Sequence, residues 1–279
     1  MAIKIKPPRN LPPDMLGVFE RMAKLVAGPR ADSLYNALPQ SRRGKIISVD
    51  VARLLAPEFR TWSGRIRHTA ATGGPAGAYA HDRLIRELNN RGKRRTLLLT
   101  AGGAGSGKTS QLMQQASSAD LVFDNQLRDW LRAREILRAA IANGWQTQVI
   151  YVHRPFHDVV RAVIERSQRT GRWNLLAELP AAHSEAQQTI VRLWRAFRDS
   201  VTVLAIYNAA SGNAERPVGS QIKAQDLAPN GRYHYADVQA LASQIEPVLK
   251  AAIKDGAVCK EIARLIGRRP KNGQGHKGN

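Results

Sequence analysis

The chain has 279 residues, of which 43% are hydrophobic, and a formal net charge of +21 at pH 7. This length and apolar content suit one α/β domain with appendages and exclude a chain too small to bury a core. The charge favours polyanionic partners such as nucleic acid, nucleotides or an acidic protein, without selecting among them.

The first part of the chain predicts an arm, short helices and one strand. Residues 1–14 are basic and proline-rich and are expected to form an extended arm, and residues 15–37 contain one or two short helices. Residues 45–49 read KIISV, a β-branched run that ends at Asp50 and predicts a strand. Residues 76–90 indicate a helix, which Gly92 ends.

A glycine-rich motif follows an apolar run that ends at Ala101. It reads Gly102, Gly103, Ala104, Gly105, Ser106, Gly107, Lys108, Thr109 and then Ser110, which matches the phosphate-binding P-loop G-x-x-x-x-G-K-T. Because glycine lacks Cβ and tolerates positive φ, successive backbone N–H groups can surround a polyphosphate. The alternative interpretation is a glycine-rich turn that ends in Lys-Thr, but the apolar run before it and the helix-compatible SQLMQQA after it favour the P-loop.

The motif predicts a nucleoside triphosphate, ATP with Mg²⁺, at this loop. Lys108 is expected to reach the β- and γ-phosphates, and the Thr109 hydroxyl to bind Mg²⁺. A helix starting near Gly107 would direct its positive end at the anion.

Strands and helices alternate through the rest of the chain. Residues 121–123, 148–152 and 201–207 predict strands, of which the third is the last, and residues 127–143, 155–169 and 183–199 predict helices. Residues 211–235 are loop-rich, residues 236–267 predict one or two helices, and residues 268–279 predict a disordered basic tail.

This alternation predicts an α/β fold with a parallel sheet, in three layers with helices on both faces. We expect a core over residues 45–210, an N-terminal arm with helices over residues 1–44, and a C-terminal helical extension over residues 211–267.

Several classes of protein or site are not expected. No apolar run approaches the roughly 18 residues that a membrane span needs, and the N-terminus lacks the apolar segment of a signal peptide, so we expect a cytoplasmic protein with no membrane partner. The one cysteine, Cys259, excludes an internal disulfide. The seven histidines lack ligand spacing, so the only metal expected is the Mg²⁺ that accompanies a nucleotide.

Several segments together resemble the zeta toxin family, roughly over residues 45–210. The similar segments are AGGAGSGKTS, LVFDN, QVIYVHRP, VIERSQRTGRW and VLAIYN. That family belongs to the P-loop kinases, and its studied members phosphorylate an amino-sugar nucleotide. The resemblance implies a three-layer P-loop kinase fold and a phosphotransferase whose leading substrate class is a nucleotide-sugar. It also implies the toxin of a toxin–antitoxin pair, with a small, acidic antitoxin as partner.

The resemblance also implies roles for arginines in a lid. Arg166 in IER and Arg172 in GRW match the two phosphate-contacting arginines of zeta toxins, although the spacing here is shorter. A guanidinium fork suits γ-phosphate oxygens. The alternative for each arginine is a solvated helix face.

The acceptor-activating carboxylate has two candidates. The segment SVDVARLLAPEF, which contains Asp50 and Arg53, is similar to the zeta-toxin segment that carries this aspartate and substrate contacts, but here it precedes the P-loop. Residues 45–49 could fill the missing place in the sheet from the other end of the chain, because ligands meet the carboxyl ends of strands whatever the connectivity. Asp124, at another strand end, is the alternative as a Mg²⁺-shell or substrate-binding group.

Structural roles remain open for these residues as well. Asp50 could be a helix N-cap, and Asp124 a strand-end turn residue. Asn208, after the last predicted strand, is where such kinases often meet adenine, but asparagine also favours turns.

The sequence therefore favours a kinase that transfers phosphate from ATP to a hydroxyl group of a small molecule. The alternative is a nucleic-acid-associated P-loop NTPase or nucleic-acid kinase, which the charge supports. Neither a hydrophobic run ending in Asp-Glu nor a basic segment with interleaved aromatics is present, so any nucleic-acid binding is expected to be non-specific.

Overall fold

The computed structural model describes residues 5–8, 11–90, 95–209, 219–235 and 237–268. The N-terminal elements are α1 (Pro13–Val26), α2 (Ala31–Asn36), β1 (Ile46–Ser48), α3 (Val49–Ala52) and α4 (Trp62–Asn89). They are followed by β2 (Thr96–Ala101), α5 (Lys108–Gln115), β3 (Leu121–Asp124), α6 (Trp130–Ala142), β4 (Gln146–His153), α7 (Phe156–Thr170), α8 (Leu179–Phe197), β5 (Val201–Tyr207), β6 (Gln221–Ile222), α9 (Val238–Ser243), α10 (Ile245–Lys254) and α11 (Lys260–Ile266). Single 3-10 turns occupy Pro39–Ser41, Arg53–Leu55, Pro57–Phe59, Leu176–Glu178 and Ala224–Leu227.

The strands of the described residues form one sheet in the order β1-β3-β2-β4-β5-β6. Every neighbouring pair is parallel except β5 and β6, which are antiparallel. The predicted α/β class with a largely parallel sheet is therefore confirmed. Because β2 lies between β3 and β4, the loop that follows β2 is at the middle of the sheet's carboxyl edge.

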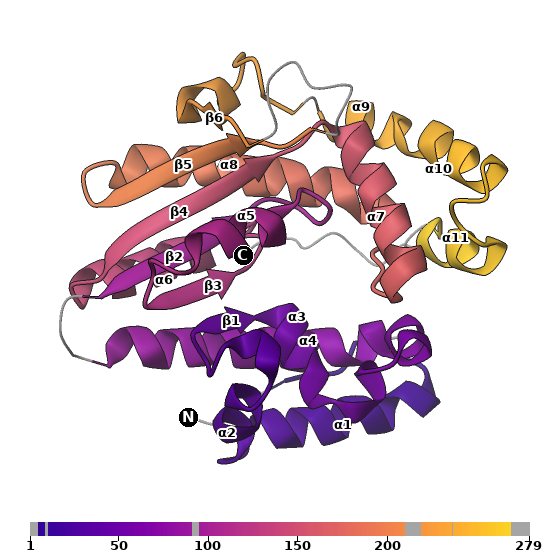
Figure 1. The fold of residues 1–279 in the computed structure, drawn as a ribbon, viewed down its shortest axis with the longest axis horizontal. Helices are drawn as coiled ribbons and strands as arrows, with labels where there is room; N and C mark the ends of the chain where they lie inside the picture. The colour runs from indigo at the N-terminus through magenta and orange to yellow at the C-terminus, as the bar shows by residue number, and fades with distance from the viewer. Residues whose placement is uncertain (1–4, 9–10, 91–94, 210–218, 236, 269–279) are drawn as a thin grey trace.

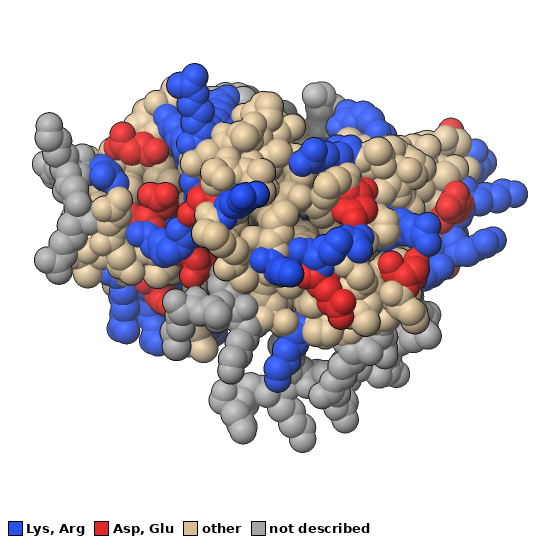
Figure 2. Space-filling model, turned by 90° about the horizontal axis from the view of Figure 1, so that it is seen from below, with Lys and Arg blue, Asp and Glu red and all other residues tan. Residues whose placement is uncertain are grey.

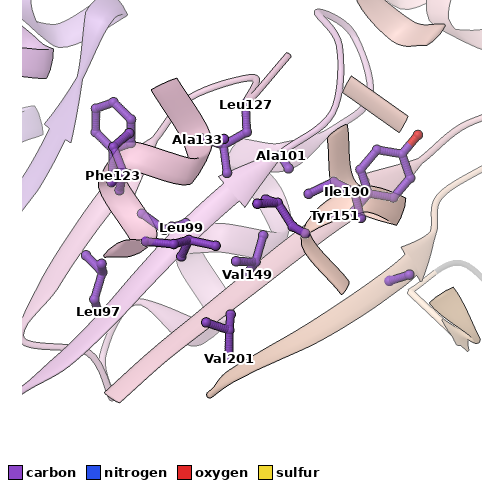
Figure 3. Close-up of a cluster of buried hydrophobic side chains, with 14 of the residues drawn as sticks. Leu97, Leu99, Ala101, Phe123, Leu127, Ala133, Val149, Tyr151, Ile190 and Val201 are labelled. Carbon is purple, nitrogen blue, oxygen red and sulfur yellow. The ribbon is translucent and has the colours of Figure 1, made fainter. Parts of the chain in front are cut away.

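Helices cover both faces of this sheet, as the near-continuous burial of its strands requires. On one face, alternate strand residues such as Leu97, Leu99 and Val149 pack in the largest core cluster with side chains of α4, α6 and α8 (Figure 3). On the other face, Leu98, Val122 and Ile150 pack against α5. Figure 1 shows α5 in front of the sheet and α6 and α8 behind it.

Strand β1 occupies the edge place that the sequence left open after the glycine motif. It runs parallel to β3, with Ile46 opposite Val122 and Ser48 opposite Asp124. The placement predicted for residues 45–49 is confirmed, although the strand is shorter because Val49 already begins α3. The Ser48 hydroxyl, rather than Asp50, caps this helix by accepting the Asp50 N–H at 3.3 Å.

Several expected element boundaries were wrong. The arm expected over residues 1–14 gives way to α1 at Pro13, because proline suits the first turn of a helix. The helix expected over residues 76–90 begins at Trp62, and Pro75 lies inside it. Its three neighbouring breakers, Gly73, Gly74 and Pro75, are tolerated because α4 packs along α1 and α3. The 201–207 strand is not the last, since β6 pairs with it.

The C-terminal part contains three helices, α9, α10 and α11, where one or two were expected. These helices pack against α7 and α8, as Figure 1 shows at the yellow end of the chain. The helix end expected at Gly92 and the tail from residue 269 onward lie outside the described residues. None of the described helices combines the length and apolarity that crossing a bilayer would require.

Candidate functional site

The glycine motif forms a tight loop between β2 and α5, which we call the glycine loop (residues 102–107). Gly102, Gly105 and Gly107 have positive φ values of 120°, 80° and 92°. Gly107 is the residue before α5, and a Cβ there would lie 2.1 Å from the Asn208 amide nitrogen. The strand–loop–helix context that the sequence predicted is therefore present, and it requires glycine at residue 107 on two counts.

Lys108 begins α5 and folds back over the glycine loop. Its Nζ donates hydrogen bonds to Gly102 O at 2.7 Å and to Gly103 O at 2.8 Å. Burial lowers the pKa of Lys108 to about 8, against the opposing effect of the Asp124 carboxylate; the charge of Arg166 lowers it further. Thr109 and Ser110, the next two residues of the motif, have exposed side chains.

Asp124 ends β3 on the edge beside Lys108. Thr100 Oγ1 of the neighbouring strand donates to Asp124 Oδ1 at 2.8 Å. Burial raises the pKa of Asp124, while the Lys108 ammonium and the Thr100 hydrogen bond oppose that rise. Asp124 is therefore part of the charged site rather than a turn residue facing solvent.

Asp50 lies on the same edge, because β1 is parallel to β3. Its side chain is 43% exposed and forms an ion pair with Arg172 and a looser one with Arg53, at 3.8 Å. Partial burial acts to raise the pKa of Asp50, but the charges of Arg172, Arg53, Arg166 and Lys108 outweigh it and lower the pKa. The expectation that Asp50 lies on the ligand edge with Lys108 is confirmed.

The two arginines of the expected lid segment reach this edge from α7 and the loop after it. The Arg166 guanidinium donates to Asn174 Oδ1, and burial lowers the pKa of Arg166 to about 10, with Arg172 adding to that effect. Arg172 donates to Asp50. The neighbouring Arg169 is exposed, so the solvated-face interpretation fits Arg169 and not the other two.

The six charged residues that the sequence singled out thus lie at one site. These six groups are close enough to shift one another's pKa values. Four are cations and two are carboxylates, so the site has a surplus of two positive charges. They come from four separate segments: Asp50 and Arg53 from α3 and the turn after it, Lys108 from α5, Asp124 from β3, and Arg166 and Arg172 from α7 and its following loop. Such an arrangement can bind a multiply charged anion and still offers carboxylate oxygens to a second group.

Asn208 contacts the glycine loop itself. Its Nδ2 donates to Ser106 O at 2.6 Å, and its backbone N–H donates to His153 O. Two loop contacts were not anticipated from the sequence: Arg154 donates to Gly105 O, and His183 approaches Ala104 O. Arg154 follows β4 directly, as Asn208 follows β5, and that position is the one sequence signal that could have identified Arg154.

A set of contacts between α4 and α7, which we call the clasp, was also not anticipated. Trp62 Nε1 donates to Gln168 O at 3.0 Å, Trp173 Nε1 donates to Ile66 O at 2.9 Å, and Arg65 Nη1 donates to Thr170 O at 3.2 Å. The clasp joins the start of α4 to the end of α7 and the loop after it, at residues within and directly after the segment that carries Arg166 and Arg172. It therefore connects the part of the chain before the glycine loop to the arginines that follow it.

Two cavities lie away from this edge. One, of about 400 Å³, opens near the amino ends of the strands between Arg83, Arg95 and Trp145. The other, of about 610 Å³, lies among apolar side chains of the N-terminal helices, including Leu34 and Leu54. We place the functional site at the carboxyl edge because the glycine loop and the charged groups meet there.

Comparison with known proteins adds no relationship to this geometry. A scan against models of protein families found no match, and a search of curated proteins also found none.

Proposed function

We propose that this chain is a P-loop kinase, similar to the zeta toxins, that transfers the γ-phosphate of ATP to a hydroxyl group of a small molecule. A nucleotide-sugar is the leading substrate class. The observation that carries the proposal is the meeting of Lys108, Asp50 and Asp124 with three arginines beside the glycine loop. Phosphoryl transfer relies on positioning and charge stabilisation, which is what such a set of groups supplies.

The glycine loop fits a bound polyphosphate. A Cβ at Gly103 would lie 2.0 Å from His183, and one at Gly107 would lie 2.1 Å from Asn208, so side chains are excluded and backbone amides can approach a ligand closely. Lys108 has its ammonium over the loop, held by two carbonyls that an incoming phosphate could replace. ATP would supply the γ-phosphoryl group, and its Mg²⁺ would offset the negative charge.

The donor set also fits Mg²⁺. The exposed hydroxyl of Thr109 and the carboxylate of Asp124 are oxygen ligands of the kind that Mg²⁺ prefers. On this proposal Asp124 serves the metal, because it lies next to Lys108.

Asp50 is then the carboxylate that orients the acceptor hydroxyl and takes its proton. The neighbouring arginines lower its pKa, so it is ionised and able to accept a hydrogen bond from that hydroxyl. Arg53 lies beside it as a substrate contact. Arg166 and Arg172 would neutralise the transferring phosphoryl group, and Arg172 also forms an ion pair with Asp50.

A γ-phosphate transfer assay tests this function. Labelled ATP and Mg²⁺ are supplied with a pool of small metabolites that includes nucleotide-sugars, and with nucleic acid in a parallel reaction. Wild-type protein should label a small molecule, Lys108→Ala should not, and Lys254→Ala, a change of an exposed lysine on α10, should behave as wild type. Normal transfer by a folded Lys108→Ala protein would contradict the proposal.

Labelling of nucleic acid alone would instead support the second candidate, a nucleic-acid kinase or nucleic-acid-associated NTPase. The net charge of +21 favours that candidate. The charge also fits the proposed cellular role, a cytoplasmic toxin neutralised by an acidic antitoxin, for which the resemblance to zeta toxins is the support. Growth arrest on expression, lost with Lys108→Ala, would be the corresponding measurement.

A further inference from the structure

Every backbone carbonyl from Gly102 to Ser106 accepts a hydrogen bond from a side chain. Lys108 takes the first two. The next three are each taken by a different residue: Ala104 O by His183 at 2.9 Å, Gly105 O by Arg154 at 3.0 Å, and Ser106 O by Asn208 at 2.6 Å. We call His183, Arg154 and Asn208 the loop clamps.

The loop clamps come from three different parts of the fold. Arg154 follows β4, Asn208 follows β5, and His183 lies in α8. The Tyr235 hydroxyl connects two of them, since it donates to Arg154 O at 2.7 Å and lies 3.2 Å from His183 Nδ1. The clamps are therefore held by the sheet and by the C-terminal region, and not by the loop itself.

His183 is set up as a donor to the loop. It is 1% exposed, and burial lowers its pKa to about 4, so the imidazole is neutral at ordinary pH. Because a carbonyl oxygen can only accept, the hydrogen bond to Ala104 O requires the tautomer with the ring proton on Nε2. The ring also lies so close to Gly103 that a Cβ at residue 103 would be 2.0 Å from it.

Fixing a carbonyl also fixes the amide that follows it. In a trans peptide the C=O of one residue and the N–H of the next lie in one plane and point in opposite directions. Clamping the carbonyls of Ala104, Gly105 and Ser106 therefore directs the N–H groups of Gly105, Ser106 and Gly107 to the other side of the backbone. The Ser106 N–H makes only a long contact, 3.4 Å, to Gly103 O.

We propose that His183, Arg154 and Asn208 are positioning residues that hold the glycine loop in its anion-binding conformation before any ligand arrives. Lys108 differs from them, because its ammonium is needed by the phosphates on the proposed function, whereas the clamps bond the three carbonyls that follow those bonded by Lys108. Only the expected effect of the clamps on ATP binding rests on the proposed function. The rigidity of the glycine loop can be measured without any nucleotide and does not depend on that proposal.

The first test measures that order directly. NMR order parameters of the Gly102, Gly103, Gly105 and Gly107 amides are compared between wild type, His183→Phe, which keeps a buried ring without a donor, and His183→Gln, which restores a donor. Gln188→Ala, on the exposed face of α8, is the matched control. We expect values near about 0.85 in wild type and control, below about 0.6 in His183→Phe, and recovery in His183→Gln.

Unchanged order in His183→Phe would overturn the inference. If that protein does not fold, Asn208→Ala and Arg154→Met decide in the same way, since both side chains are only partly buried. Either folded variant should loosen the loop, and a rigid loop in both would contradict the clamp role.

The second test measures binding and rate. Loss of one loop clamp should weaken ATP and pyrophosphate binding by about tenfold, with a rise in KM larger than the fall in kcat, and Gln188→Ala should change neither. Wild-type protein that binds neither ligand would reject the proposed function, while the order parameters would still decide the inference. Variants that loosen the loop but bind as wild type would reject the claim that the clamps serve binding.

Discussion

Lys108 lies among groups that act on its pKa in opposite directions. Burial and Arg166 favour the neutral amine, and Asp124 and Asp50 favour the ammonium, with burial the largest effect. The result is a pKa of about 8, well below that of a solvated lysine, which is about 10.4. The charge that the proposed function assigns to phosphate binding is therefore lost as pH rises through about 8.

We expect kcat/KM for ATP to fall as pH rises through about 8. Below that pH Lys108 is charged and can hold the phosphates, and above it the neutral amine loses most of that attraction. Because kcat/KM reports groups of the free enzyme, the decline should appear there and be weaker in kcat, since bound phosphate stabilises the ammonium. A kcat/KM that is flat between about pH 7 and 9.5 would contradict this pKa assignment.

Replacing Asp50 or Asp124 by asparagine should affect different steps of the proposed reaction. Asp50→Asn should keep ATP binding and lose transfer to the acceptor, because Asp50 is paired with arginines and is the group that we propose to orient the acceptor hydroxyl. Asp124→Asn should weaken Mg²⁺-dependent ATP binding, because Asp124 lies next to Lys108. Isothermal titration with Mg–ATP and a transfer assay separate the two. Full transfer by Asp50→Asn would move the proton-accepting role to Asp124.

Arg166 is predicted to act on the transition state. Arg166→Ala should lower kcat by about a hundredfold or more while ATP affinity changes little, because a lid arginine neutralises charge that develops during transfer. Arg169→Ala, on the exposed face of the same helix, is the matched control and should be silent. Equal losses of binding and turnover in Arg166→Ala would show a ground-state contact.

Some site residues could be predicted from the sequence and others could not. Lys108 and the loop glycines belong to a contiguous motif with its own chemistry, and Asp50 follows a recognisable strand. His183 and Trp62 contact residues that are far away in the chain. No local pattern encodes such partners, so these residues became visible only in three dimensions.

At the level of elements, α7 is held from two sides. The clasp joins its end to the start of α4, and Gln168 Oε1 accepts the Cys259 N–H at the start of α11. Helices α10 and α11 also pack on α7, which Figure 1 shows at the right of the sheet. The segment that bears Arg166 and Arg172 is therefore built into the fold of the ligand-free protein.

Trp173→Phe should test the clasp. Loss of the indole bond to Ile66 O should lower the free energy of unfolding by about 1 kcal/mol and also reduce transfer, because Arg172 is the preceding residue. Trp145→Phe is the matched control, since it removes a similar bond, to Leu88 O, away from the site. Urea unfolding and the transfer assay are measured together. An equal effect of both variants on transfer would contradict a specific role for the clasp.

Helices and strands with a regular spacing of apolar residues were predicted more reliably than those that contain glycine and proline. The strand over residues 201–207 matches β5 at both ends. By contrast, α4 was predicted at half its length, because Gly73, Gly74 and Pro75 are helix breakers when considered locally. Packing along α1 and α3 stabilises the part of α4 whose local helix propensity is low. Such packing involves residues far apart in the chain, so the sequence of one segment does not reveal it.

Across the whole molecule, positive charge is distributed rather than concentrated on the visible face. Figure 2, on the side of α1 and α2, shows Lys and Arg side chains interspersed with Asp and Glu. Several of these charges are paired, as in Arg21–Glu58, Arg67–Asp14 and Arg86–Asp32. On this face the positive charges are spread among negative ones and do not form one continuous basic patch. The net charge of +21 therefore produces a general positive field around the molecule.

Binding to nucleic acid should accordingly be non-specific and strongly salt-dependent. We expect affinity for duplexes of unrelated sequence to be similar, and to fall about a thousandfold between about 50 and 200 mM salt, as counterion release requires. Fluorescence anisotropy over a salt series measures both. A preference for one sequence that persists at physiological salt would favour the nucleic-acid kinase candidate.

Strand β1 is synthesised long before β3, the strand with which it pairs. Residues 46–48 leave the ribosome well before residues 122–124, their only partners within the described sheet. At about 5–20 residues per second, the nascent chain carries Asp50 for seconds before β3 exists to receive its strand. Arg172 is made last among the six charged residues of the site. A chain whose translation stops between α5 and α7 therefore has Asp50 and the glycine loop but neither Arg166 nor Arg172, and the site is complete only once synthesis has passed that helix.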